Sequence, residues 1–119
     1  MPRPLIAIPA RFSSSAAALR YEAEVSARKL VEAVYAAGGE PLSIHPSAPA
    51  GTISDADVSQ RLGFADGVLL PGGGDLHPAH YGAASHESLY DMDMEQDAFD
   101  LAVARWSLGA GRPLLHVSP

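Results

Sequence analysis

Four short apolar runs recur along the chain, and each is bordered by proline or glycine. They occupy residues 5–8, 41–44, 68–70 and 114–117. A run of this length is too short for a helix, and the proline and glycine on its borders mark turns. Continuous apolar runs without alternation are typical of strands that are buried on both faces of a parallel sheet. The pattern therefore predicts four buried strands.

Amphipathic stretches separate these runs. The first prediction is a helix over residues 17–37, ended by Gly38 and Gly39, and its apolar positions recur at helical spacing: Ala23, Ala27, Leu30, Val34 and Ala37. A short helix is expected over residues 55–62, with Ser54 or Asp55 as its N-cap. A third helix is expected over residues 95–108, with Asp93 as N-cap and Phe99 and Trp106 on its buried face.

Strands and helices thus alternate from one end of the chain to the other. This order is typical of an α/β fold, in which helices flank a mostly parallel sheet and the crossovers are right-handed. No repeat, linker or second domain interrupts residues 1–119, so one domain is expected. Such a fold normally continues with a helix that covers its last strand, and we therefore expect the sheet to be incomplete after the fourth strand.

Composition and charge exclude several classes of function. Hydrophobic residues make up 47% of the 119 residues and the net charge is −6, which is ordinary for a globular domain. An acidic chain with no basic run is a poor binder of nucleic acid or of anionic membranes. Neither a secretory signal nor a membrane span is recognisable, so a cytoplasmic location is expected. The sequence has no cysteine, which excludes a disulfide, a thiolate metal site and a cysteine nucleophile within these residues.

A glycine-rich segment follows the third predicted strand and reads Pro71-Gly72-Gly73-Gly74-Asp75. It leaves the carboxyl end of the strand, where open α/β sheets bind their ligands. Consecutive glycines allow backbone N–H groups to approach a bound anion closely. The segment lacks the lysine of a phosphate-binding P-loop, and Pro78 stands where a dinucleotide-binding motif would begin a helix.

Several ordered motifs together resemble the class I glutamine amidotransferase-like superfamily, and specifically its gamma-glutamyl-gamma-aminobutyrate hydrolase group. The similar segments, in chain order, are residues 3–9, Tyr21, residues 37–41, residues 66–75 with His77-Pro78 and Tyr81-Gly82, Asp93, Asp97 with residues 99–101, and residues 111–115. The segment with three glycines is the most specific of them. The resemblance covers the N-terminal half of such a domain.

The resemblance implies hydrolysis of the amide bond of a small γ-glutamyl compound without any cofactor. A cysteine would attack the carbonyl carbon, and a histidine oriented by a glutamate would move the protons. Backbone N–H groups would hold the oxyanion, one from the glycine segment and one from the residue after the cysteine. The first donor corresponds to Gly73, with Gly72 and Gly74 shaping the backbone, and the nucleophile position corresponds to Ser118.

This sequence departs from the family pattern at its last residues. Ser118 replaces the cysteine, His116 replaces a small residue, and Pro119 has no N–H to donate to an oxyanion. The histidine and glutamate of the triad would belong to the other half of the domain. We therefore expect this 119-residue chain to be inactive, as a fragment or frame-shifted form of a hydrolase. The alternative is a non-catalytic binding or interaction module of the same fold, and uncovered apolar surface would favour association with a second copy.

Other polar residues allow different interpretations. Asp75, His77 and His80 are of types that ligate zinc or manganese, and His86, Asp91 and Asp93 follow nearby. They fall on a predicted loop without helical spacing, so we predict no metal site. His116 and Ser118 would point the same way on a strand and could form a dyad, whereas His45 is interpreted as a polar strand end.

Overall fold

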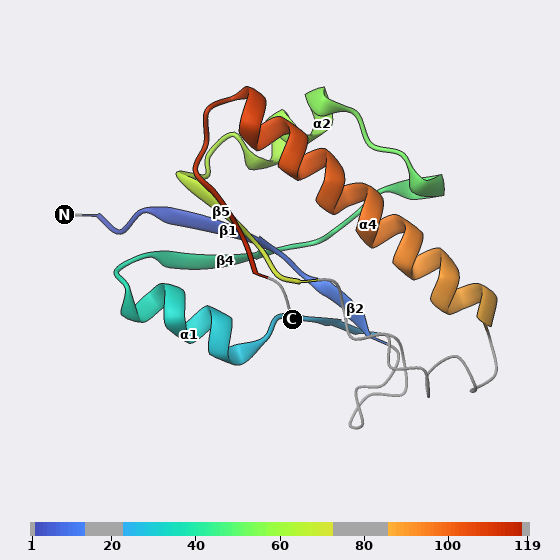
Figure 1. Cartoon of the computed structure of the whole chain (residues 1–119), viewed down its shortest axis with the longest axis horizontal. Helices are drawn as coiled ribbons and strands as arrows, with labels where there is room; N and C mark the ends of the chain where they lie inside the picture. Colours follow the sequence, from blue (N-terminus) through green and yellow to red (C-terminus); the bar gives the residue numbers. More distant parts are fainter. Residues whose placement is uncertain (1, 14–22, 73–85, 118–119) are drawn as a thin grey trace.

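The computed structural model describes residues 2–13, 23–72 and 86–117, with side chains from residue 94 onward in the last range. Four strands form one sheet in the order β4-β1-β5-β6 (Figure 1). They are β1 (Leu5–Pro9), β4 (Glu40–Ile44), β5 (Gly67–Leu70) and β6 (Leu114–His116), and all neighbouring pairs are parallel. The prediction of an α/β fold with a parallel sheet is confirmed, and all four apolar runs are strands.

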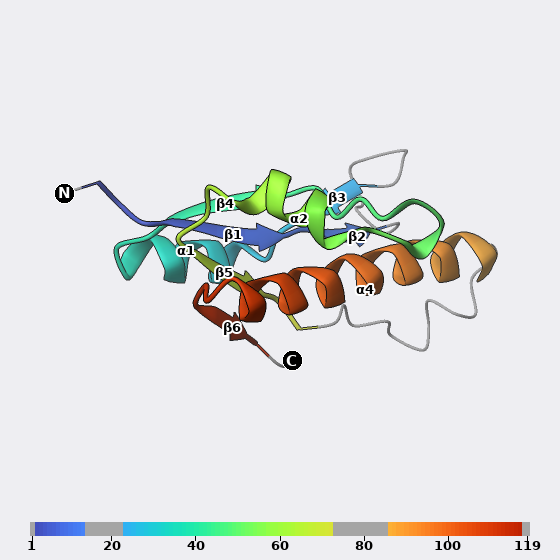
Figure 2. The ribbon, with the colours of Figure 1, turned by 90° about the horizontal axis from the view of Figure 1, so that it is seen from above.

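Helices lie on both sides of this sheet. Helix α1 (Arg28–Ala36) packs against β4, whereas α2 (Asp55–Leu62) and α4 (His86–Gly109) pack against each other on the opposite side (Figure 1). A short 3₁₀ turn, η1 (Pro49–Gly51), precedes α2. Figure 2 shows α4 running along most of the long axis of the molecule. None of the helices in the described part of the chain has the length and apolar composition that a membrane crossing requires.

The helix predicted over residues 17–37 is wrong at its start. Helix α1 begins at Arg28, and Ala23 lies instead in a short strand, β3 (Ala23–Val25). This strand pairs antiparallel with β2 (Arg11–Ser13), which continues the chain just beyond β1. Pairing between residues 11–13 and 23–25 thus overrides the helical spacing of the alanines, because helical propensity is only a weak preference.

The structure confirms the residues predicted to end α1 and to cap the start of α2. At the end of α1, Gly38 adopts a positive φ of 104°, and the N–H groups of Gly38 and Gly39 donate to the carbonyls of Tyr35 and Val34. This is the glycine-dependent Schellman ending, which caps the last carbonyls of a helix. The Ser54 hydroxyl accepts from the N–H of Asp57 at 3.1 Å and caps the start of α2.

Helix α4 begins nine residues earlier than the predicted position, at His86 rather than at Glu95. Asp93 therefore lies inside the helix and is not its N-cap. Asp93 is a residue type that often caps helices, and this preference led to a predicted start that lies inside the helix. The extra turns carry α4 beyond the end of the sheet, toward β2 (Figure 2).

The core fills the space between the sheet and the pair α2–α4. Its fully buried side chains include Phe99 and Val103 of α4, Val58 and Leu62 of α2, and Ala7 of β1. The predicted apolar face of the last helix is confirmed, since Phe99 and Trp106 both belong to this cluster. Burial of this apolar surface is what holds α2 and α4 against the strands.

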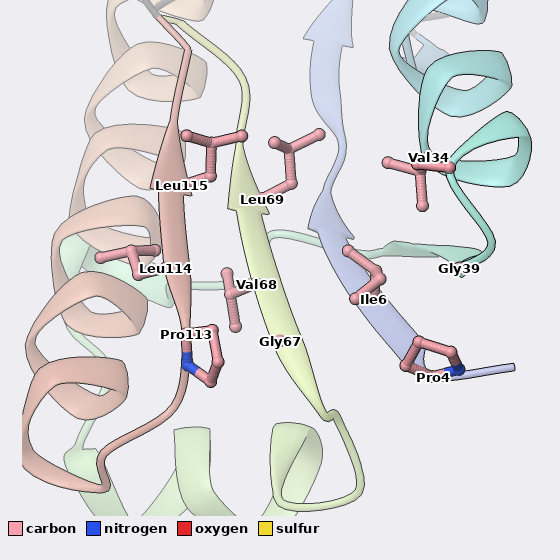
Figure 3. A pocket seen from close by; sticks show the side chains of 11 residues that line it. Pro4, Ile6, Val34, Gly39, Gly67, Val68, Leu69, Pro113, Leu114 and Leu115 are labelled. Carbon is pink, nitrogen blue, oxygen red and sulfur yellow. The ribbon is translucent and has the colours of Figure 1, made fainter.

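The opposite face of the sheet has an apolar groove between α1 and the strands β5 and β6, with a volume of about 360 Å³ (Figure 3). Val34 of α1, Ile6 of β1, Leu69 of β5 and Leu115 of β6 contribute to its lining. Leu115 is 61% exposed, so this part of the sheet is uncovered among the described residues. Association with a second copy stays a prediction, because nothing in the structure shows what covers the groove.

A buried ion pair joins the start of β2 to α4. The Arg11 guanidinium donates to both carboxylate oxygens of Asp100, from Nη1 at 2.5 Å and from Nη2 at 2.9 Å. The two side chains are only 11% and 19% exposed. Four residues nearer the start of α4, the Gln96 side-chain carbonyl accepts from the N–H of Phe12 at 2.8 Å. These contacts fix the β2–β3 ribbon to the helix.

Removing one partner of this ion pair should be costly. Asp100→Ala leaves the Arg11 guanidinium buried without its counter-charge, and we expect a loss of about 3–5 kcal/mol in the free energy of unfolding. The double substitution Arg11→Met with Asp100→Leu should recover most of that loss, because the two apolar side chains need no partner. Urea denaturation followed by circular dichroism measures both values.

The exposed pair on α1 provides the matched control. Arg28 and Glu32 form an i,i+4 ion pair at 2.7 Å, but their side chains are 90% and 59% exposed. Glu32→Ala should cost only about 0.5 kcal/mol. Equal losses for Asp100→Ala and Glu32→Ala would contradict a structural role for the buried pair.

Candidate functional site

The carboxyl ends of β5 and β6 lie side by side and form the candidate site. The parallel register pairs Val68 with Leu114 and Leu70 with His116. One further bond, from the N–H of Val117 to the carbonyl of Leu70 at 2.9 Å, extends this pairing beyond the last strand residue. The chain that follows β5 and the chain that follows β6 therefore leave the sheet from the same edge, next to each other.

The predicted site residues belong to these two exits. Gly72 is half-buried and follows Pro71 directly after β5. Gly73, Gly74 and Ser118 lie outside the described residues, so their predicted roles stay predictions. Val117, the last described residue before Ser118, bonds to Leu70, which precedes Gly72 by two residues.

A cavity of about 460 Å³ opens beside these strand ends. Leu70 and Pro71 line it from β5, and His116 lines it from β6. Asp97 and Asp100 line it from α4. The cavity thus combines an apolar wall from the sheet with two carboxylates and an imidazole, and such a mixed lining is typical of small-molecule sites.

Burial of Asp100 changes its chemistry. Loss of contact with water raises the pKa of the Asp100 carboxyl above 3.8, while the hydrogen bond and the charge of Arg11 act in the opposite direction. The nearby charge of Asp97 raises this pKa further. Desolvation outweighs the ion pair here because both groups of the pair are withdrawn from water.

The middle of α4 supports the loops at this edge of the sheet. Besides the contacts of Gln96 and Asp100, the carboxylate of Glu95 accepts from the N–H of Ala48 at 2.9 Å, in the segment after β4. Three side chains of one helix thus bind the segments that follow β1 and β4.

Sequence reasoning missed the Arg11–Asp100 pair. Its two residues are separated by 89 positions, and a single sequence carries no signal that pairs them. A weaker hint was available, because Arg11 comes two residues after a buried strand and a charge in that position needs a partner.

The other polar residues singled out in the sequence, the alternative metal ligands and His45, are only partly among the described residues. Asp75, His77 and His80 of the alternative metal cluster lie outside the described residues, whereas the backbone of His86, Asp91 and Asp93 belongs to α4. Within the residues whose side chains are described, no three histidine, aspartate or glutamate side chains gather as a metal site requires. His45 lies at the end of β4, where its Nδ1 pairs with the carboxylate of Glu24.

Comparison with known proteins identifies the family. The model of the peptidase C26 family matches residues 4–118, which is nearly the whole chain. A curated relative from Lactococcus lactis subsp. cremoris, the glutamine amidotransferase-like protein YvdE homolog, is 34% identical over 61 residues. That match covers 51% of this chain and 32% of the relative, so it spans about a third of the relative's length.

The chain belongs to the peptidase C26 family. Both comparisons support the superfamily that the sequence motifs resemble. The family match runs through both strand exits of the candidate site, from Gly72 to the position of Ser118.

The raised pKa of Asp100 predicts a specific pH dependence. A carboxyl whose pKa is higher in the folded than in the unfolded state binds its proton more tightly when folded. As the pH falls through that raised pKa, the wild type should gain free energy of unfolding relative to Asp100→Asn, which cannot take up a proton. As the pH rises toward neutrality, this relative gain should disappear.

Urea denaturation of both proteins between about pH 3 and pH 7 measures this difference, since the ordinary pKa of an aspartate lies near 3.9. The absolute stability of both proteins will vary with pH for other reasons, so only their difference is informative. A wild type that instead loses stability relative to Asp100→Asn on acidification would show that the Arg11 charge, and not burial, dominates this site.

Proposed function

We propose that this chain provides the oxyanion-binding edge of a site for γ-glutamyl amides, in a scaffold of the hydrolase type. The observation that carries the proposal is the pairing of β5 with β6, which ends in the bond from Val117 to Leu70. This pairing places Val117 beside Leu70, and the two segments of interest follow these residues in the sequence. In the resemblance described above, those two segments hold the oxyanion donor and the nucleophile.

In this proposal the N–H of Gly73 donates to the carbonyl oxygen of the scissile amide. The negative charge on that oxygen grows as the tetrahedral intermediate forms, so a fixed donor binds the transition state more tightly than the substrate. Glycine suits the position, because a Cβ would crowd the substrate. The attacking group would come from residue 118, which is a serine in this chain.

Two features of the sequence limit catalysis by these residues. A serine hydroxyl needs a general base within hydrogen-bonding distance. In the resemblance, the histidine and glutamate that would serve belong to the other half of the domain. Pro119 cannot donate a second N–H to the oxyanion, and loss of one such donor costs about 10²–10³ in rate. We therefore infer that the wild-type residues bind the γ-glutamyl group and cleave it very slowly or not at all.

The second candidate function is a binding module that lacks catalysis altogether. The pair Ser118-Pro119 favours it, because this pair removes a thiolate nucleophile and an oxyanion donor at once. The two candidates differ in one measurable property: whether residue 118 can be acylated when its chemistry is restored.

A cysteine at position 118 distinguishes them. With γ-glutamyl-p-nitroanilide near pH 8.5, where about half of an ordinary cysteine is thiolate, Ser118→Cys should attack the amide carbon. The C–N bond breaks, p-nitroaniline leaves with a proton from solvent, and a γ-glutamyl thioester remains on the protein. Intact-mass spectrometry should show one added γ-glutamyl group, and absorbance should show one equivalent of p-nitroaniline.

Matched variants make the result specific. Ser43→Cys places a thiol on the exposed surface of β4 and should acquire no γ-glutamyl group. Adding Pro119→Gly to Ser118→Cys restores an N–H and should raise the rate of acylation by up to about 10². If Ser118→Cys is acylated no faster than Ser43→Cys, while still binding the anilide, the binding module is correct. If it neither binds nor reacts, both candidates are wrong.

A further inference from the structure

A second cavity lies between the segment that follows β4 and helix α2, at the same carboxyl edge of the sheet but on the side of β4. Its volume is about 670 Å³, and polar side chains from both elements line it. They include His45 and Ser47 from the segment after β4, and Asp57, Gln60 and Arg61 from α2. β1 separates β4 from β5, so this cavity is distinct from the candidate site at the ends of β5 and β6.

An aspartate and an arginine of α2 line this cavity and do not form an ion pair with each other. Asp57 and Arg61 are four residues apart on α2, a spacing at which aspartate and arginine commonly form an ion pair. No ion pair joins them among the described residues. Arg61 instead donates from Nη2 to the carbonyl of His45 at 2.8 Å. The pair Arg28–Glu32 on α1 has the same spacing and does close, at 2.7 Å.

The guanidinium of Arg61 is held in place, but one of its nitrogen atoms has no hydrogen-bond partner among the described residues. It lies over the ring of Phe99, 5.2 Å from the ring centroid, and so it is attached to the core. Its Nη1 atom is buried and has no hydrogen-bond partner in the described part of the chain. Buried donors nearly always have a partner, either a group of the protein or an ordered water.

The wall opposite α2 is also fixed. The Nδ1 atom of His45 pairs with the carboxylate of Glu24 on β3, and the imidazole stands edge-on to the ring of Phe12 on β2, with 6.1 Å between ring centroids. The ribbon β2–β3 therefore holds the imidazole in one orientation at the rim of the cavity. Such preorganisation lowers the entropy that a ligand must lose on binding.

We propose that this cavity binds a small amino acid in its zwitterionic form, with the carboxylate at Arg61 and the ammonium group at Asp57. Arginine is suited to a carboxylate because its planar guanidinium offers several donors, and aspartate is suited to an ammonium group because it only accepts. The polar neutral side chains of Ser47 and Gln60 complete the lining. The site is independent of the γ-glutamyl function proposed above.

Three small compounds test the two charges separately. Alanine carries both groups, propionate lacks the ammonium group, and ethylamine lacks the carboxylate. In ¹H–¹⁵N NMR titrations of the full chain, alanine should shift the amide signals of residues 45–61 and saturate with a dissociation constant of about 1 mM. Propionate and ethylamine should each bind about tenfold or more weakly, since each loses a charge-assisted hydrogen bond.

Single variants assign each charge. Asp57→Asn should weaken alanine binding to the level of propionate and leave propionate binding unchanged. Arg61→Gln should weaken both. Because Arg61 packs on Phe99, that variant could unfold, and Gln60→Glu then replaces it: a carboxylate beside Arg61 should repel alanine and propionate alike. Glu32→Gln on α1 is the control and should change nothing.

The outcomes separate clearly. Saturable shifts at residues 45–61 that follow this order of ligands and variants support the site. Shifts that stay linear with alanine concentration, equal affinities for the three compounds, or an Asp57→Asn protein that binds alanine like the Glu32→Gln control would each overturn it.

Discussion

The parallel pairing of β5 with β6 is the constraint on which the rest of this structure depends. Two parallel strands cannot be joined by a tight turn, so the chain between them must cross over the sheet. Here α4 makes most of that crossover and supplies Phe99, Val103 and Trp106 to the core. The same pairing makes the carboxyl ends of the two strands meet at one edge, where Leu70 accepts from Val117. The pairing of β5 with β6 therefore determines both the crossover by α4 and the position of the candidate site.

Polar contacts from α4 then determine the shape of that edge. Arg11 with Asp100, Phe12 with Gln96 and Ala48 with Glu95 each join the helix to a segment that follows a strand. Two of the three use a backbone N–H as donor, so they depend on the path of the chain and not on the identity of the donating residue. The Arg11–Asp100 pair is different, because its burial makes each partner depend on the other. Burial also raises the pKa of Asp100, so desolvation reduces what the ion pair adds to net stability.

The parts of the fold that sequence predicts well are those with local causes. Buried strands show as apolar runs because both of their faces are covered, and Ser54 and Gly38 mark helix ends because their own chemistry acts there. The errors arise where distant residues decide. Ala23 is in a strand because Ser13 pairs with it, and α4 starts at His86 although Asp93 looks like a cap.

The candidate site shows the same division. Gly72 and its neighbours are site residues predicted from local sequence and from the family resemblance, and the match over residues 4–118 supports that resemblance at the level of the superfamily. The roles of Arg11, Gln96 and Asp100 were not, since each depends on a partner more than 80 positions away. The unpaired charges on α2 could not be predicted from the sequence either. The spacing of Asp57 and Arg61 predicts an ion pair, but Arg61 donates instead to the carbonyl of His45.

If γ-glutamyl compounds bind where β5 and β6 end, a γ-glutamyl amide should change the ¹H–¹⁵N spectrum of the wild-type chain at defined residues. We expect saturable amide shifts at residues 69–74 and 115–118, in the two segments that end the paired strands. Shifts confined to residues 45–61, in the segment after β4 and in α2, or no saturable shifts at all, would show that the compound does not bind there.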